Sequence, residues 1–110
     1  SALMRDILRT LVQKCGGRVV AEADSVSSAV ELYLKTRPNL LILDILFPGE
    51  LGISGLRTIL EKEPDAKVVI ITAVNQDGLD RQMLLMGAKY VLHKPFGIPE
   101  LTKAMEQALK

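Results

Sequence analysis

Three residues that could act together on an anion end three separate apolar runs of the sequence. Asp44 ends the run LLILD, Thr72 ends KVVIIT, and Lys94 ends YVLHK. A carboxylate can attack phosphorus to form an acyl phosphate, an ammonium group can neutralise the developing charge, and a hydroxyl can donate a hydrogen bond. The small residue Ala73 leaves room above the carboxylate. If the fold brings the three run ends together, they predict a site that handles phosphate.

Four short apolar runs predict the strands that must position these residues. They are residues 18–23, 40–44, 67–72 and 90–94. The second and third are almost continuous Val, Ile and Leu, which is typical of parallel strands covered on both faces. Ligands of an open parallel sheet bind beyond the carboxyl ends of its strands, where Asp44, Thr72 and Lys94 are expected.

Segments with helical spacing alternate with these runs. A stripe that includes Leu3 and Ile7 predicts a first helix ended by the glycines at 16 and 17, and Ser25 or Ser27 can cap a second. Further helices are expected over 54–62 and 77–86, and after Pro99 at the first turn of the last. We assign every apolar stripe to the core. The alternation predicts an α/β fold with a parallel sheet between two helix layers.

Length and composition exclude several classes of protein. The 110 residues fit a single domain over 1–110, and 48% apolar with 25% charged residues suffices for a core. A net charge of +1 without a basic block argues against nucleic-acid binding, and no apolar run is long enough to span a membrane. The single cysteine, Cys15, and the single histidine, His93, permit neither an internal disulfide nor a Cys/His zinc site. A reducing cytoplasm is the expected location.

Competing enzyme classes lack their motifs. There is no G-x-x-x-x-G-K-[ST] loop for a nucleoside triphosphatase, and Gly49, Gly52 and Gly55 do not have the dinucleotide-binding spacing. A Ser/His/Asp hydrolase would need a G-x-S-x-G elbow, which is absent, and His93 should face away from Lys94.

The chain resembles a known family, the receiver domains of bacterial two-component response regulators. The likeness covers essentially all 110 residues and rests on three motifs in family order: LLILDILFPG at 40–49, VIITA at 69–73 and GAKYVLHKPF at 87–96. It implies a flavodoxin-like three-layer sandwich with a parallel sheet of strand order 2-1-3-4-5.

The resemblance also implies the roles of the site residues. Asp44 would accept a phosphoryl group from a histidine kinase or phosphotransfer protein, and Lys94 would contact that group. Thr72 would be the switch hydroxyl, with Ala73 beside the phosphoryl group. Phosphorylation would then change the binding of an effector domain or partner protein.

A magnesium ion is the cofactor that the resemblance implies. Asp44 and the backbone carbonyl of Leu46 would be ligands, and the peptide bond between Lys94 and Pro95 would be cis. Family members begin with a strand that ends in two acidic residues, the other magnesium ligands. This chain starts where that strand should already have finished, so the first strand and its acids are absent from the sequence.

A second departure concerns the switch aromatic, which family members place three residues before the lysine. Val91 occupies that position, and its neighbour Tyr90 should face the opposite side of the sheet. Tyr90 and Val91 are therefore both retained as switch candidates with Thr72.

Two functions remain open. The first is a receiver domain controlled by phosphorylation of Asp44; the alternative is a pseudo-receiver, an interaction module that works without phosphorylation because the metal-binding acids are missing. The absent central strand leaves residues 18–23 and 40–44 without their common neighbour. They could pair directly or exchange strands with a second copy, and we expect at least a homodimer with non-standard pairing near 18–23.

Overall fold

The computed structural model describes residues 2–23, 25–45, 50–73 and 77–110. These residues form three strands and five helices. In chain order the elements are α1 (Ala2–Lys14), α2 (Val26–Thr36), β1 (Leu41–Ile45), α3 (Glu50–Lys62), β2 (Val68–Thr72), α4 (Asp77–Met86), β3 (Tyr90–His93) and α5 (Ile98–Leu109).

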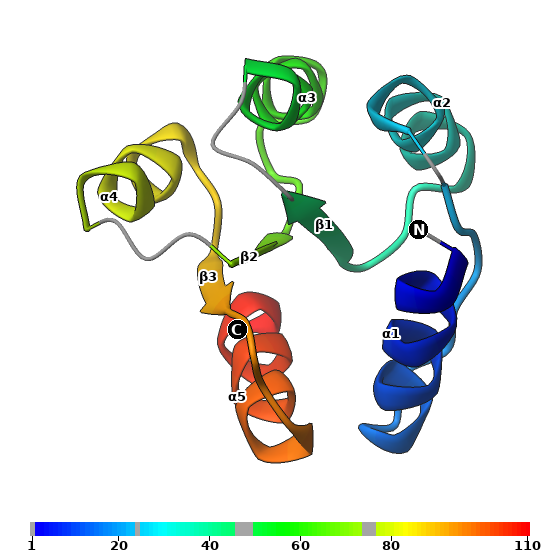
Figure 1. Cartoon of the computed structure of the whole chain (residues 1–110). Helices are drawn as coiled ribbons and strands as arrows, with labels where there is room; N and C mark the ends of the chain where they lie inside the picture. The colour runs from blue at the N-terminus through cyan, green and yellow to red at the C-terminus, as the bar shows by residue number, and fades with distance from the viewer. Residues whose placement is uncertain (1, 24, 46–49, 74–76) are drawn as a thin grey trace.

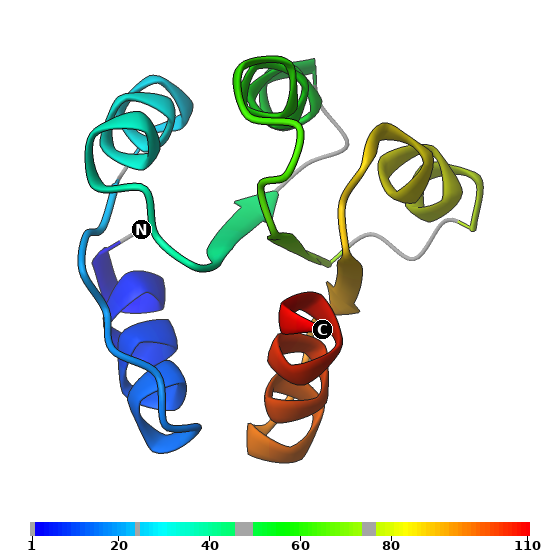
Figure 2. The same cartoon turned by 180° about the vertical axis from the view of Figure 1, so that it is seen from behind.

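The strands form one parallel sheet in the order β1-β2-β3. Helices α2, α3 and α4 lie on one face of this sheet, and α1 and α5 lie on the other (Figures 1 and 2). The predicted flavodoxin-like layering of an α/β sandwich is therefore confirmed. Because the strands are parallel, the carboxyl ends of β1, β2 and β3 lie at the same edge of the sheet.

The core consists of two clusters, one on each face of the sheet. Alternate residues of the central strand β2 supply both: Val68 and Ile70 belong to the cluster under α2, α3 and α4, whereas Val69 and Ile71 belong to the cluster under α1 and α5. Every residue of β2 is buried. This explains why its sequence is continuously apolar instead of alternating.

Local signals set several helix ends. The Ser25 side chain accepts a hydrogen bond from the Ser28 backbone N–H at 3.1 Å, so Ser25 is the N-cap of α2. Gly87 has a φ of +121°, a conformation that glycine adopts without strain, and it follows the end of α4. Helix α3 begins at Glu50, four residues earlier than the predicted start at 54, so Gly52 lies inside the helix despite its low propensity.

The predicted strand over residues 18–23 is wrong. These residues belong to no helix or strand, and the described part of the chain places no strand on the open edge of β1 either. Direct pairing of 18–23 with the strand at 40–44, one of the two arrangements considered above, is therefore not observed in the described part of the chain. An isolated strand leaves its N–H and C=O groups without ladder partners, so apolar alternation alone does not produce one. Instead, Arg9 of α1 binds Glu22 through a two-pronged ion pair.

Two residues of the predicted core stripe of α1 are exposed. Leu3 is 69% exposed and Ile7 45%, and Ile98 at the start of α5 is 39% exposed. Among the described elements, α1 packs chiefly on α5. Leu8, Leu11 and Val12 therefore join the core, whereas Leu3 and Ile7 in the first turns of α1 stay exposed among the described residues.

None of the helices in the described ranges combines the length and the apolar character needed to cross a bilayer.

Candidate functional site

The three candidate residues lie at the carboxyl end of the sheet. Asp44 is the fourth residue of β1, Thr72 is the last residue of β2, and Lys94 directly follows β3. The parallel register aligns Asp44 with Ile71 and aligns Thr72 with both Ile45 and His93. The strand ends therefore position all three residues along one edge, as the apolar runs predict.

Asp44 and Lys94 contact each other directly. The Lys94 Nζ lies 2.9 Å from Asp44 Oδ2 and donates a hydrogen bond to it, although the residues are 50 apart in the sequence. The side chains are 18% and 26% exposed for Lys94 and Asp44, respectively. A partly buried ion pair at a strand-end rim can present a carboxylate to a phosphoryl group and hold the cation that balances its charge.

The second carboxylate oxygen, Asp44 Oδ1, is buried and has no hydrogen-bond partner among the described residues. Beside Asp44 and Lys94 lies a cavity of about 20 Å³. The other described residues of its lining are apolar: Ile7, Leu8 and Leu11 of α1, Ile71 of β2, and Phe96. A cavity of this size holds roughly one water molecule.

Thr72 lies at the same rim but faces the other layer. Its neighbour Ile71 belongs to the cluster under α1 and α5, so strand alternation directs Thr72 toward the layer of α2, α3 and α4. The same alternation directs Asp44 toward α1 and α5, because Ile45 belongs to the opposite cluster. Thr72 is fully buried, and Ala73, which follows it, is exposed.

The two switch candidates on β3 lie on opposite faces. Val91 packs against the cluster under α2, α3 and α4, whereas Tyr90 packs against the cluster under α1 and α5. Val91 therefore shares the face of Thr72, and Tyr90 does not.

The described residues do not by themselves fit a magnesium site. They contain no group of three His, Cys, Asp or Glu side chains that could hold a metal ion. Beyond Asp44, the cavity wall offers apolar side chains and a lysine, whereas magnesium is held by oxygen ligands. Leu46, the other expected ligand, lies outside the described residues.

The peptide bond between Lys94 and Pro95 is cis, as the family resemblance implies.

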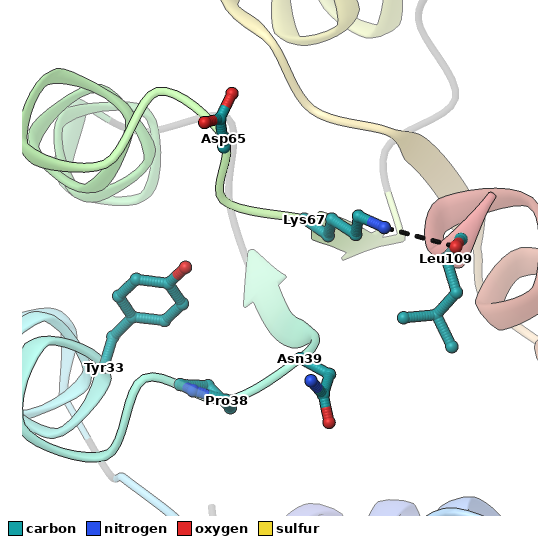
Figure 3. A pocket seen from close by; sticks show the side chains of 6 residues that line it. All are labelled: Tyr33, Pro38, Asn39, Asp65, Lys67 and Leu109. Carbon is teal, nitrogen blue, oxygen red and sulfur yellow. Dashed lines mark hydrogen bonds between the residues drawn. The ribbon is translucent and has the colours of Figure 1, made fainter.

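A larger pocket, of about 420 Å³, lies at the opposite end of the sheet (Figure 3). Its lining includes Pro38 and Asn39, which precede β1, and Asp65 and Lys67, which precede β2. The Lys67 Nζ donates a hydrogen bond to the Leu109 carbonyl at 3.2 Å, which satisfies a carbonyl at the end of α5. This pocket is separate from the rim that holds Asp44 and Lys94.

One feature near the rim is absent from the sequence-based prediction: an ion pair between His93 of β3 and Asp80 of α4. The His93 Nε2 lies 2.8 Å from Asp80 Oδ2. Strand alternation places His93 on the face of β3 opposite Leu92, which is the face that α4 covers. That alternation is visible in the sequence, but the helix residue that meets His93 is not.

Known proteins with similar sequences agree on one family. The family model described as response regulator receiver domain matches residues 1–106. The chemotaxis protein CheY of Listeria monocytogenes is 35% identical over 107 residues, which cover 97% of this chain and 90% of that protein. CheY of Thermotoga maritima is 30% identical over 110 residues, which cover 100% of this chain and 92% of that one.

A solved structure gives the same assignment. The crystal structure of the CheX-CheY-BeF3-Mg2+ complex from Borrelia burgdorferi contains a chain similar to this one, with a TM-score of 0.91 and 26% sequence identity. The match covers 100% of this chain and 84% of that chain. The strand-end motifs, the layered parallel sheet and these similarities together show that the chain belongs to the response regulator receiver domain family of two-component signalling.

Proposed function

We propose that residues 1–110 form one receiver domain that accepts a phosphoryl group on Asp44. The donor is a phosphorylated histidine of a kinase or phosphotransfer protein. The observation that carries this proposal is the contact between Asp44 Oδ2 and Lys94 Nζ at the carboxyl end of the sheet.

The free cysteine Cys15 suits a reducing compartment, so we propose that the protein is located in the cytoplasm.

In the proposed phosphoryl transfer, the main task of the protein is to position the reacting groups. A carboxylate oxygen of Asp44 attacks phosphorus, the bond between phosphorus and the donor imidazole nitrogen breaks, and the imidazole keeps that electron pair. An acyl phosphate forms on Asp44. Lys94, already held at the carboxylate, then balances the added negative charge as a point cation.

The output is a change in the binding of a partner protein or effector domain. Thr72 and Val91 share the face toward α4, so they are the residues through which the rim can influence that helix. The Borrelia CheY structure is a complex with a protein, CheX. This supports a protein partner for the present chain.

The proposed alternative is a pseudo-receiver that binds its partner without phosphorylation. Receiver domains generally use Mg2+, and Asp44 is the carboxylate in the described lining of the cavity beside Lys94, with no group of three potential ligands among the described residues. Apolar side chains of α1 close the space beside that carboxylate, which favours this alternative.

Intact-mass spectrometry after incubation with acetyl phosphate distinguishes the two functions. We expect the wild-type chain with Mg2+ to gain the mass of one phosphoryl group, and Asp44→Asn to gain none. Asp65→Asn is the matched control, because Asp65 is exposed at the opposite end of the sheet. A parallel incubation with a chelator measures the metal requirement. A folded wild-type chain that stays unmodified in both incubations would establish the pseudo-receiver.

A further inference from the structure

The ion pair between α4 and β3 has no role in the proposed phosphorylation chemistry. His93 Nε2 and Asp80 Oδ2 are 2.8 Å apart, and their side chains are 35% and 19% exposed. Their geometry satisfies an ion pair but lacks the alignment of a hydrogen bond, and both His93 Nε2 and Asp80 Oδ1 are buried without hydrogen-bond partners in the described part of the chain. Attraction between two opposite full charges requires the imidazolium form of His93.

Among the described residues, the pair has no second ion-pair partner. From β2, the residue aligned with His93 is the uncharged Thr72. From α4, the charged partner is Asp80. Helix α5 packs on the other face of β3, with Tyr90 and Leu92 in between. Lys94, the next residue, is bound to Asp44 on that other face.

Helix α4 has few other attachments to the sheet. It packs on β3 and less extensively on α3, and Met83 is its fully buried side chain. Its outer side carries Leu84 and Leu85, which are 46% and 81% exposed. Leu79 and Met86 also pack α4 on the core, and the ion pair adds to this packing beside the Thr72 end of β2.

We propose that Asp80 and His93 form a proton-dependent clamp that fixes α4 on β3. When His93 is protonated, the imidazolium and the Asp80 carboxylate attract each other and α4 is held on the sheet. When His93 loses its proton, the attraction between full charges disappears and α4 is held less tightly. The clamp is therefore stronger in acid, where His93 is protonated, than in alkaline solution. It does not require Asp44 to accept a phosphoryl group.

A double-mutant cycle at two pH values tests the clamp. The stabilities of wild type, Asp80→Asn, His93→Gln and the double variant are measured by urea unfolding at pH 5.5 and pH 8.5. His93 is the single histidine of the chain, so its imidazole NMR signal reports directly which form is present at each pH. We expect a coupling of about threefold in the unfolding equilibrium constant at pH 5.5, and a clearly smaller one at pH 8.5.

The Arg9–Glu22 ion pair provides the matched control. The hydrogen bond to Arg9 holds the pKa of Glu22 below its usual value, and Glu22 raises the pKa of Arg9. Both groups stay charged at the two pH values, so the cycle of Arg9→Gln and Glu22→Gln should give the same coupling at each. If the Asp80–His93 coupling is absent at pH 5.5, or equal at both pH values, the clamp proposal is wrong.

Hydrogen exchange in wild type keeps the test decisive if a variant does not fold. Protection factors of α4 amides, relative to those of β2, should be higher at pH 5.5 than at pH 8.5. An equal ratio at the two pH values would contradict the clamp, whatever the outcome of the phosphorylation experiment.

Discussion

Lys94 is the residue that connects the end of β3 to the carboxylate of β1. Its ammonium group donates to Asp44 Oδ2 at 2.9 Å, and the contact is partly open to solvent. Such a pair stabilises a fold only slightly, because screening and side-chain entropy offset most of the attraction. A flexible point cation can, however, follow the charge from the carboxylate to a phosphoryl group. We therefore assign Lys94 to function more than to stability.

Replacement of Lys94 by Ala tests this assignment. We expect the free energy of unfolding to fall by no more than about 1 kcal/mol, whereas phosphorylation from acetyl phosphate or partner binding should be largely lost. Urea unfolding and intact mass measure the two effects. Lys103→Ala, at an exposed position on α5, is the control and should change neither. A Lys94→Ala chain that unfolds outright would mean that the lysine is mainly structural.

Part of the site could be predicted at the level of single residues. Asp44 and Lys94 each end an apolar run, and the carboxyl ends of parallel strands share one edge, so their proximity follows from topology. The opposite facing of Tyr90 and Val91 also follows from strand alternation. The apolar lining beside Asp44 cannot be predicted in this way, because it depends on how Ile7, Leu8 and Leu11 of α1 pack against the sheet.

Among the elements, β2 contributes most to the core because it has a paired strand on each side and helices on both faces. All five of its residues are buried, and its side chains enter both core clusters. The position of Thr72 at the rim therefore depends on a strand with very little freedom to move.

Truncation of a buried β2 side chain should lower the free energy of unfolding substantially. Ile70 is fully buried, and Ile70→Ala removes buried apolar area and leaves a cavity, so we expect a loss of about 2–5 kcal/mol in the free energy of unfolding. Leu85→Ala is the comparison: Leu85 is 81% exposed, and its change should stay within about 0.5 kcal/mol. Urea unfolding measures both. Similar values for the two variants would contradict the described core.

The attachment of residues 17–23 to α1 should depend on pH. Hydrogen bonding to Arg9 lowers the pKa of Glu22, so this ion pair contributes stability above the carboxylate's ordinary pKa and loses it as pH falls through the lowered value. The raised pKa of Arg9 keeps it charged throughout. Thermal melts of wild type and Glu22→Gln should therefore differ at neutral pH and converge in acid. A constant difference across that range would show that the ion pair is not the cause.

The elements differ in how well the sequence predicts them. The apolar runs that form β1, β2 and β3 each lie beside another strand of the sheet, so their pattern is sufficient to predict them as strands. Residues 18–23 show a similar pattern, with Val19 and Val20 in the middle, but no described strand lies beside them. Strand formation is a property of a pair of segments, so a pattern within one segment cannot guarantee it.

At the scale of the whole molecule, the open edge of β1 is the main irregularity. The Leu41 N–H donates to the Lys67 carbonyl at 2.9 Å, on the side of β2. Alternation along a parallel strand then directs the N–H and C=O groups of Ile42 and Asp44 to the other edge, where the described residues place no strand. Such an edge is a template for pairing with another chain.

We therefore expect the 110-residue chain to associate through this edge, at least to a dimer. Sedimentation equilibrium over a range of dilutions should show an average mass that rises with concentration. Ile42→Pro removes an N–H that the β1–β2 ladder does not use and should shift the equilibrium toward monomer. Leu85→Ser, on the exposed side of α4, should leave association unchanged. A wild-type chain that is monomeric at every concentration would contradict the expected pairing.

The most direct test of phosphorylation at the Asp44–Lys94 rim is the location of the phosphoryl group. After treatment with acetyl phosphate, borohydride reduction converts an aspartyl phosphate to homoserine, and peptide mass spectrometry locates that residue. We predict homoserine at position 44, and none in the Asp44→Asn chain. Homoserine at another aspartate, with Asp44 intact, would contradict the assignment of the Asp44–Lys94 rim as the phosphorylation site.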